Sequence, residues 1–93
     1  SKSMLKLNVS TKFKRDYKVC NKRGYNLQLL QIVIDILRIP EFLEKKYKDH
    51  KLSGNYEGCR ECHILPDWLL IYRINDDELY LVRIGTHSDL FGI

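Results

Sequence analysis

Residues 59–84, CRECHILPDWLLIYRINDDELYLVRI, decide the fold of this chain. They contain three runs dominated by apolar side chains, at residues 59–65, 68–74 and 79–84. Pro66-Asp67 and the polar residues 75–78 separate these runs, and both connections have hairpin length. Sequential strands joined by such short turns predict an antiparallel meander.

Two helices are predicted ahead of the meander. Ser10 or Thr11 can cap a first helix that runs to about Arg23, where Gly24 is a natural stop. Asn26 can cap a second helix that is predicted to run to about Ile39, because the proline that follows disfavours helical backbone. The connection between the two is short, so we expect an antiparallel helical hairpin.

The remaining segments complete the predicted fold. Residues 4–9 alternate between apolar and polar side chains, which predicts a short strand that can extend one edge of the sheet. Residues 40–58 are predicted to form an irregular connection with one helical turn over 41–46. The pattern predicts a single α+β domain over residues 1–93. In it, an antiparallel sheet of about four strands carries the helical hairpin on one face and leaves the other face open.

The composition limits the location and size of the protein. A chain of 93 residues is sized for one modest core, and it contains no apolar run of about 18 residues that would predict a membrane span. No basic start is followed by an apolar signal core, so export is not expected. Three cysteines are an odd number, which argues against a secreted disulfide framework and favours a reducing cytoplasm.

Basic residues gather at the start of the chain. Residues 1–24 contain eight Lys and Arg but one acidic residue, Asp16, whereas the remaining residues contain eight basic and eleven acidic ones. This asymmetry predicts a polyanionic partner or an acidic protein partner, although a solvated helix face has the same composition. The candidate binding residues on the first helix are Lys12, Lys14, Arg15, Lys18 and Lys22.

All three histidines lie in the second half of the chain, at His50, His63 and His87. Imidazole is the side chain whose ordinary pKa lies nearest neutrality, so it can both accept and donate a proton. Together with Asp67 and Arg83, these histidines supply the groups that metal-free phosphoryl chemistry on RNA requires.

Strand alternation sorts the candidates onto two faces of the sheet. The side chains predicted to face the core are Cys62, Ile64, Tyr80, Val82 and Ile84. His63 and Arg83 are therefore predicted to share the open face. Asp67 lies in the turn after the strand of His63, and His87 follows Arg83 by four residues, so these groups are expected to converge.

Each candidate also has an ordinary structural interpretation. A single strand histidine such as His63 is more often structural than catalytic, and Arg83 can pair with Glu61 at the surface. Asp67 follows a proline, as turn residues commonly do. Trp68 is interpreted either as a core residue or as a substrate-binding wall of a cleft. The functional interpretation therefore rests on the set and not on one member.

The segment Cys59-x-x-Cys62-His63 resembles half of a zinc site. Strong zinc signatures contain two such pairs, and one is present here. Residues 59 and 62 also point to opposite faces of a strand, so they cannot chelate one ion together. No P-loop, dinucleotide-binding motif or carboxylate cluster is visible. The sequence therefore predicts no metal and no cofactor, and a nuclease built from these residues is expected to be metal-independent.

Three ordered motifs resemble the YafQ branch of the RelE-like bacterial toxins. They read KDHxLxG at 48–54, RECHIxPDWxLIY at 60–72 and RxGTHSxLF at 83–91. The resemblance covers roughly residues 48–91, whereas residues 5–40 agree only in helix layout. It implies a microbial-RNase-like fold and a ribosome-dependent messenger-RNA endonuclease, or mRNA interferase, of a type II toxin–antitoxin pair. The implied partners are a DinJ- or RelB-like antitoxin in a hetero-oligomer, messenger RNA in the ribosomal A site, and ribosomal RNA.

The resemblance also implies an active site and a reaction. The implied site residues are His50, His63, Asp67, Arg83, His87 and Phe91. The 2′-hydroxyl of the RNA would attack the adjacent phosphorus and expel the 5′-oxygen, with His87 as general acid and Arg83 as stabiliser of the transition state. His50, His63 and Asp67 remain alternatives for the base and the orienting roles, and Phe91 is expected to stack on or position a base.

Two other functions fit the same sequence. A non-catalytic basic module that binds nucleic acid or an antitoxin would depend on the lysines of the first helix more than on the histidines. A ribosome-independent RNase would use the same histidines on naked RNA. The expectation of ribosome dependence comes from the resemblance alone.

Overall fold

The structure is a computed structural model that describes residues 4–39 and 44–93. Its elements are β1 (Lys6–Val9), α1 (Thr11–Lys22), α2 (Leu27–Arg38), η1 (Lys45–Tyr47), β2 (His50–Lys51), η2 (Gly54–Tyr56), β3 (Arg60–Leu65), β4 (Trp68–Asn75), β5 (Glu78–Gly85) and α3 (His87–Phe91). The predicted helical turn over 41–46 lies partly outside the described residues, and its described end belongs to the 3₁₀ turn η1. Within the described residues, no helix is long and apolar enough to cross a membrane.

The sheet has five strands in the order β1-β5-β4-β3-β2. β3, β4 and β5 form the predicted antiparallel meander. β1 lies at one edge, as expected, but it pairs with β5 in parallel, so the sheet is mixed. β2 is an additional strand that pairs antiparallel with β3 at the other edge. The direction of β1 is set by the path of the chain through the helices, which alternation within one strand does not encode.

The helix caps lie where the sequence predicts them. The Ser10 hydroxyl accepts a hydrogen bond from the Phe13 N–H over 2.9 Å, and the Asn26 side chain accepts one from the Gln28 N–H over 3.1 Å. Gly24 has a φ of +82°, a left-handed conformation that glycine adopts without steric cost. Ser10 thus fixes the start of α1, and Gly24 and Asn26 fix the two ends of the connection between α1 and α2.

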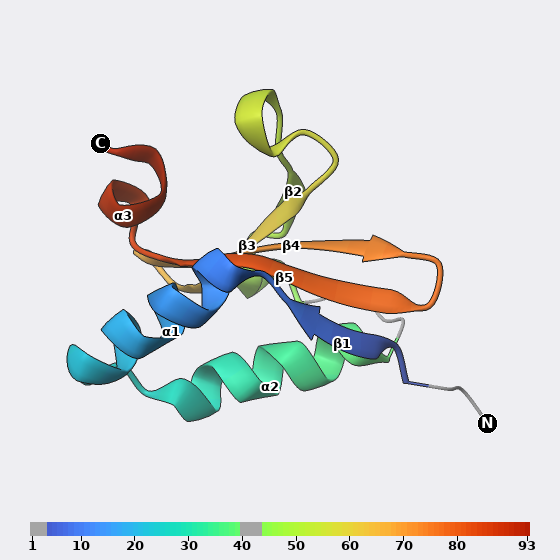
Figure 1. Cartoon of the computed structure of the whole chain (residues 1–93), viewed down its shortest axis with the longest axis horizontal. Coiled ribbons are helices and arrows are strands. Elements are labelled where there is room, and N and C mark those ends of the chain that lie inside the picture. Colours follow the sequence, from blue (N-terminus) through green and yellow to red (C-terminus); the bar gives the residue numbers. More distant parts are fainter. Residues whose placement is uncertain (1–3, 40–43) are drawn as a thin grey trace.

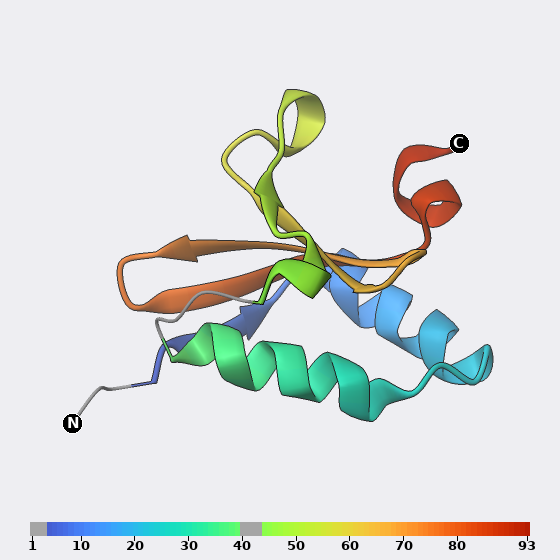
Figure 2. The same cartoon turned by 180° about the vertical axis from the view of Figure 1, so that it is seen from behind.

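The sheet separates the molecule into two sides. Figure 1 shows α1 and α2 on one side of the sheet, while α3 and the segment with β2 project from the other side, and Figure 2 shows the same arrangement from behind. The larger core lies between α1, α2 and the sheet. It is centred on Trp68, which stacks on Tyr25 at 4.7 Å and donates its indole N–H to the Cys20 sulfur over 3.3 Å.

A second, smaller core covers the face that was predicted to be open. Its buried members are Cys59, Leu69, Ile71 and Leu90, and Leu52, Tyr56 and Val82 pack against them. Leu90 belongs to α3, so this short helix is anchored by an apolar side chain. The open face is thus only partly open, and the candidate site residues surround its small core.

β5 contains a β-bulge that changes which side chains face the helices. Leu81 pairs with Tyr72 and Arg83 pairs with Ile71, which leaves Val82 as an additional residue in β5. An extra residue reverses the alternation of side chains along a strand. Leu81 therefore faces the helix-covered core, whereas Arg83 faces the opposite side of the sheet.

The bulge corrects one prediction from strand alternation. Tyr80 and Val82 were predicted to face the helix-covered core, but they do not belong to it. Leu79 and Leu81 belong to this core instead. Ile84 is buried in this core, as predicted. Leu81 and Ile84 are three residues apart and cannot share a face of a regular strand, so only the extra residue lets both face the helices.

α1 continues the edge of the sheet where β1 stops. β1 pairs with β5 only as far as Leu81. Beyond this point the Ser10 hydroxyl donates to the Val82 carbonyl over 2.6 Å, and the Asp16 carboxylate accepts a hydrogen bond from the Ile84 N–H over 3.1 Å. Backbone groups removed from water need such partners, so two side chains near the start of α1 replace a missing strand.

α3 is held by local and by distant contacts. Thr86 and Asp89 form a capping box, in which each side chain accepts a hydrogen bond from the other residue's backbone N–H over 3.0 Å. Asp89 also forms an ion pair with the guanidinium of Arg23, at the end of α1, with a shortest N–O distance of 2.7 Å. Gly85 allows the helix to approach, because a Cβ there would lie 2.9 Å from the Cβ of Asp89.

We expect the Arg23–Asp89 contact to make stability depend on pH. The Arg23 side chain first, and the Thr86 N–H second, lower the pKa of Asp89 from 3.8 to about 2. A carboxyl group whose pKa is lower in the folded chain than in the unfolded chain stabilises the fold at pH values above its unfolded-state pKa. This contribution is lost as pH falls through its folded-state pKa. Asp89→Asn should lower the free energy of unfolding by about 1 kcal/mol at pH 6, allowing for solvent screening, and by progressively less between pH 4 and pH 2.

Urea unfolding followed by circular dichroism at both ends of this range measures the effect. Asp77→Asn is the matched control, since within residues 4–39 and 44–93 it removes one exposed ion pair, with Lys6, and should change stability by less than about 0.5 kcal/mol. A loss in Asp89→Asn that is equally large at pH 6 and pH 2 would contradict the expected linkage.

Candidate active site

His87 is held at the start of α3 by Asp67 from the β3–β4 turn. The backbone N–H of His87 donates to Asp67 Oδ1 over 2.8 Å, and Nδ1 of its ring lies 2.5 Å from the same oxygen. The backbone hydrogen bond first, and the ring contact second, lower the pKa of the Asp67 carboxyl. Because an ionised carboxylate only accepts, it keeps a proton on Nδ1 and leaves Nε2 of His87 as the nitrogen available to substrate.

The structure brings the three histidines into one row. The ring of His63 lies 5.7 Å from the ring of His87 and 6.1 Å from the ring of His50, between ring centres. His63 is contributed by β3, His50 by β2 and His87 by α3, so three separate elements converge. His63 is at the centre of the row and is the most buried of the three.

The carboxylate of Glu61 contacts two of these imidazoles. Its Oε1 lies 3.3 Å from Nε2 of His50 and 3.3 Å from Nε2 of His63. The Glu61 side chain is only 5% exposed, and its Oε2 has no hydrogen-bond partner among the described residues. The pairing of Glu61 with Arg83, one of the interpretations drawn from the sequence, is not what the structure shows.

The segment that carries His50 is fixed by a polar network. Nδ1 of His50 lies 2.7 Å from the carbonyl oxygen of Lys48, and a carbonyl only accepts, so Nδ1 carries the proton. The neighbouring Asp49 accepts hydrogen bonds from Arg60 Nε over 3.1 Å and from the Tyr72 hydroxyl over 2.8 Å. Burial first, and the bond to Asp49 second, raise the pKa of Tyr72, which keeps this hydroxyl a donor.

Arg83 faces Asp16 of α1 and not the histidines. Its Nε lies 2.6 Å from one carboxylate oxygen of Asp16 and its second terminal nitrogen lies 3.0 Å from the other, while the remaining nitrogen lies 3.4 Å from the Tyr56 hydroxyl. The Asp16 contact raises the pKa of Arg83, so the guanidinium is a permanent cation. Across the sheet, two strand spacings of about 4.8 Å each separate its backbone from that of Glu61.

Phe91 lies at the end of α3 beside Tyr56. The two rings meet edge to face, with 6.0 Å between their centres. Phe91 is 39% exposed, so part of its ring is available to an incoming base. Tyr56 therefore contacts both Phe91 and Arg83, and the predicted site residues form two groups: a histidine group, and an Arg83 group with Phe91.

Trp68 does not belong to either group. It is 0% exposed in the helix-covered core, where Tyr25 and Cys20 cover it. The prediction that Trp68 contacts substrate is therefore wrong, because a fully buried indole offers no surface. The other interpretation of the sequence, a core tryptophan, is the one that the structure supports.

The basic residues of α1 are exposed but do not all lie on one side. Asp16 and Arg23 mark the side of the helix that faces Arg83 and Asp89. At 3.6 residues per turn, about 100° per residue, Lys12 lies about 40° around the helix from Asp16, Arg15 about 100° and Lys22 about 120°. Lys14 and Lys18 lie about 160° away from Asp16 and are the most distant of the five.

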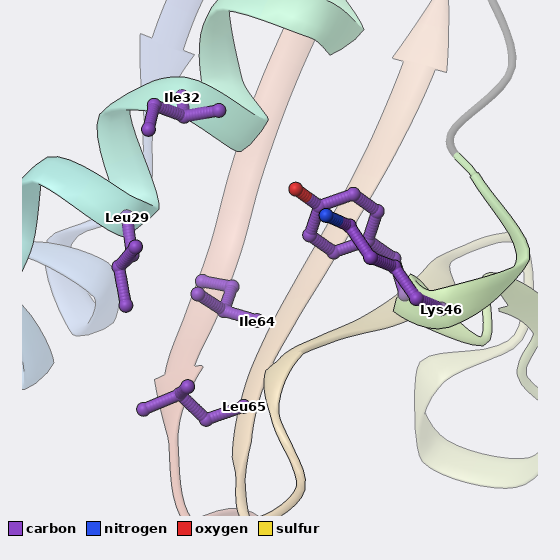
Figure 3. Close-up of a pocket in the computed structure, with 6 residues that line it drawn as sticks. Leu29, Ile32, Lys46, Ile64 and Leu65 are labelled. Atoms are coloured by element: carbon purple, nitrogen blue, oxygen red, sulfur yellow. The ribbon is translucent and has the colours of Figure 1, made fainter.

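Two shallow hollows lie near η1. One of about 200 Å³ is lined by Lys46, Lys48, His63, Ile64, Leu65 and Pro66. It joins two ammonium groups to an imidazole of the histidine row, a combination that suits a phosphate group. The other, of about 210 Å³, is shown in Figure 3, where Leu29 and Ile32 of α2 flank it on one side and Lys46 on the other. Its lining is mostly apolar, so it is not a site for the same chemistry.

The cysteines carry no metal site in this fold. Cys59 and Cys62 lie in the two different cores, on opposite sides of the sheet, as strand alternation predicts. Burial raises the pKa of the Cys62 thiol, which makes it a poor nucleophile. Among the described residues, the one group with suitable ligand atoms close together is His50, Glu61 and His63.

Sequence reasoning missed Asp16 and Glu61 as members of the site. Each carries a usable signal: Asp16 is the single carboxylate in a basic helix, and Glu61 is a charged residue within a strand of the central sheet. Helix α3 was also missed, although Thr86-x-x-Asp89 has the spacing of a capping box. Tyr56 has no comparable signal, since it precedes the strands in an irregular segment.

Comparison with known proteins gives consistent results. The family described as "Bacterial toxin of type II toxin-antitoxin system, YafQ" matches residues 5–92. The chain is 37% identical over 89 residues to the mRNA interferase toxin YafQ of Escherichia coli strain K12, covering 92% of this chain and 95% of that protein.

Solved structures agree with the sequence relatives. A metal-bound toxin from Helicobacter pylori superposes with a TM-score of 0.88 at 46% identity, covering 95% of this chain and all of that one. The toxin in the E. coli DinJ–YafQ complex superposes with a TM-score of 0.87 at 36% identity, covering 95% and 99% of the two chains. The family match over residues 5–92 includes all of the site residues described above.

We expect Asp16 to restrain the Arg83 side chain. Asp16→Asn removes the charge and one of the two oxygens that Arg83 grips, and a hydrogen bond to a charged group contributes about 1.5–3 kcal/mol. Solvent exchange of the Arg83 Nε proton should therefore become about 10- to 100-fold faster, as measured by NMR. Asp35→Asn is the control, because it makes the same change on α2, where the Asp35 carboxylate accepts a hydrogen bond from the Gln31 side chain among the described residues. Equal exchange rates in both variants would contradict the restraint.

Proposed function

Because the chain belongs to the YafQ family of bacterial type II toxins, we propose that it is the toxin of a toxin–antitoxin pair and acts as an endoribonuclease on messenger RNA. One observation carries this proposal: three imidazoles meet in a row, and one of them is fixed by a carboxylate. A nuclease that uses the 2′-hydroxyl of its RNA needs a base and an acid on either side of one phosphate, and imidazoles suit both roles.

His87 is the general acid in this proposal. Its Nδ1–H is held by Asp67, so protonation at Nε2 gives an imidazolium next to an ionised carboxylate. That pairing stabilises the charged form and directs the Nε2 proton outward, toward the departing 5′-oxygen. The backbone N–H of His87 donates to the same carboxylate, so the backbone that carries the ring is also held in place.

The base comes from the pair of histidines that meet at Glu61. An acid and a base that act on one phosphate each reach it through a hydrogen bond of about 2.6–3.2 Å, so the two groups lie several ångströms apart. The rings of His63 and His87, with 5.7 Å between their centres, have a spacing of this size. In the neutral His50 ring Nδ1 is protonated, so Nε2 is its basic nitrogen. His63 and His50 therefore both present nitrogens to the same carboxylate.

Arg83 and Phe91 serve the transition state and the base of the substrate. The guanidinium of Arg83 retains donor hydrogens that are not directed at Asp16, and it stabilises charge on the phosphorane-like transition state. Phe91 offers a partly exposed ring on which an unstacked base can pack. Contact of both with one nucleotide requires the RNA to run from the histidine row toward Tyr56.

Ribosome dependence and antitoxin binding complete the proposal. The basic side of α1 next to Arg83 suits ribosomal RNA, because neutralising phosphates drives such docking. Lys46 and Lys48 extend the positive charge on the other side of the histidines. The E. coli DinJ–YafQ complex supports pairing of this chain with an antitoxin of its own.

Removing the imidazole of His87 should stop cleavage. A positioned acid is typically worth about 10²- to 10⁴-fold in rate, so His87→Ala should lose that much activity on messenger RNA and relieve growth arrest. The fold should survive, because the backbone N–H that binds Asp67 remains. Ser88→Ala, an exposed neighbour in α3, is the matched control and should keep full activity. A fully toxic His87→Ala would exclude this role.

Mapping of 5′ ends after brief induction tests the substrate. Cuts confined to translated reading frames at a fixed codon position, and absent with His87→Ala, are the expected result. Cuts that also arise on naked RNA at the same rate would replace this proposal with a ribosome-independent RNase. Growth arrest that needs no cutting would replace it with a binding module.

Charge reversal on α1 separates docking from chemistry. We expect Lys12→Glu with Arg15→Glu and Lys22→Glu to weaken ribosome binding at least about 10-fold and to flatten its salt dependence, because three phosphate contacts are lost. Lys14→Glu with Lys18→Glu is the control on the distant side of the helix and should have a smaller effect. Sedimentation with ribosomes at two salt concentrations measures both, and equal losses would mean that the side of α1 does not matter.

A further inference from the structure

Tyr56 carries a hydroxyl group whose proton has no acceptor among the described residues. The hydroxyl oxygen lies 3.4 Å from one terminal nitrogen of Arg83 and accepts a hydrogen bond from it. A phenol hydroxyl both accepts and donates, so its own proton remains available. The Tyr56 side chain is half-buried, which leaves this donor open to a substrate.

The ring of Tyr56 is held from two sides. It packs against the smaller core on the active-site face of the sheet, and it meets Phe91 edge to face with 6.0 Å between the ring centres. A ring held in this way keeps its hydroxyl beside Arg83. The donor is therefore in place before a substrate arrives, and it needs little reorganisation during a reaction.

Tyr56 also lies next to the proposed acid. Phe91, which it contacts, follows His87 by four residues in α3. Side chains four residues apart on a helix share a face, with Cβ atoms about 5–6 Å apart. Tyr56 thus connects Arg83 on β5 with the His87 end of the histidine row.

Arg83 has donors left beside this hydroxyl. A guanidinium has five N–H groups. Within the described chain, Asp16 accepts from two of them and Tyr56 from a third. The hydrogen bond from the cation polarises the tyrosine hydroxyl and makes its proton a stronger donor. Arg83 and Tyr56 can therefore direct donors from adjacent atoms at one anionic oxygen.

We propose that Tyr56 is a further catalytic residue, whose O–H donates to a non-bridging oxygen of the scissile phosphate beside the Arg83 guanidinium. This role rests on the proposed nuclease function, in which that oxygen gains negative charge as the 2′-hydroxyl attacks the phosphorus. A donor already directed at developing charge stabilises the transition state more than the ground state, and so raises the rate of the chemical step.

The distances favour direct contact with substrate over support of Arg83. An N–H···O hydrogen bond usually measures about 2.7–3.2 Å, so the 3.4 Å contact between Arg83 and Tyr56 is a weak restraint. Asp16 holds the same guanidinium over 2.6 and 3.0 Å. Arg83 therefore keeps its place without the hydroxyl, and the hydroxyl is free to turn its proton toward a phosphate.

Tyr56→Phe removes the hydroxyl and keeps the ring, so the fold and the contact with Phe91 should survive. On messengers in translating ribosomes, kcat should fall about 10- to 100-fold and KM should change less than about 3-fold, since the loss shows in the transition state. Tyr80→Phe is the matched control, because it removes a phenol hydroxyl from β5 and keeps the ring that packs on Arg73. It should retain the original rate.

Sulfur in the messenger locates the contact. A phosphorothioate replaces one non-bridging oxygen at the position that 5′-end mapping identifies, and sulfur is a weak hydrogen-bond acceptor. One of the two stereoisomers should slow the wild-type chain. In Tyr56→Phe this slowing should be at least about 3-fold smaller, because groups in direct contact are energetically coupled. An equal sulfur effect in both chains would overturn the direct contact.

Solvent exchange at Arg83, followed by NMR, separates this role from mere positioning. In Tyr56→Phe the Arg83 Nε proton should exchange within about 3-fold of the wild-type rate, since Asp16 holds this nitrogen. Exchange as fast as in Asp16→Asn would mean that Tyr56 acts only through Arg83, and the proposal would fail.

Two further outcomes separate this role from the proposed function. An unchanged kcat in Tyr56→Phe, beside an active wild-type chain, would overturn the role of Tyr56 and leave the nuclease function standing. A wild-type chain that cuts no messenger would overturn the nuclease function, and the role of Tyr56 with it.

Discussion

The β-bulge at Val82 is the constraint on which both cores and the site depend. Leu81 and Ile84 must face the helices, and Arg83 between them must not, which only an extra residue permits. The pairing with β1 stops at Leu81, just before the bulge, so the backbone of β5 needs other partners beyond this point. Ser10 and Asp16 supply them, and the start of α1 is thereby tied to the part of β5 that carries Arg83.

This connection explains why Asp16 is found in a helix that is otherwise basic. One carboxylate satisfies the Ile84 N–H and grips the guanidinium of Arg83. The same end of β5 continues through Gly85 into α3, where the approach of Asp89 leaves no room for a Cβ. The positions of Arg83 and His87 are thus set by one short stretch of backbone, and the Arg23–Asp89 pair links that stretch again to α1.

Local signals in the sequence were sufficient for most of the fold. Ser10, Gly24 and Asn26 act within a few residues of their own positions, so the helix ends could be predicted. The direction of β1 and the bulge in β5 depend on pairings between distant segments, which no local pattern contains. The site could be predicted only where local patterns suffice. Strand alternation places His63 on the face opposite the helix-covered core, whereas the contact between Asp16 and Arg83 joins residues 67 positions apart and has no local signal.

The two cores allow the protein to keep a costly group in its site. A carboxylate at position 61 is buried beside Ile71, where an apolar side chain would pack without an unpartnered oxygen. Such a cost of about 1–3 kcal/mol is large for a domain of this size, and it persists where function requires it. The larger core, with Trp68 at its centre, lies on the other side of the sheet and does not include Glu61. Stability is therefore supplied mainly by one face, and the other face is free to hold charge.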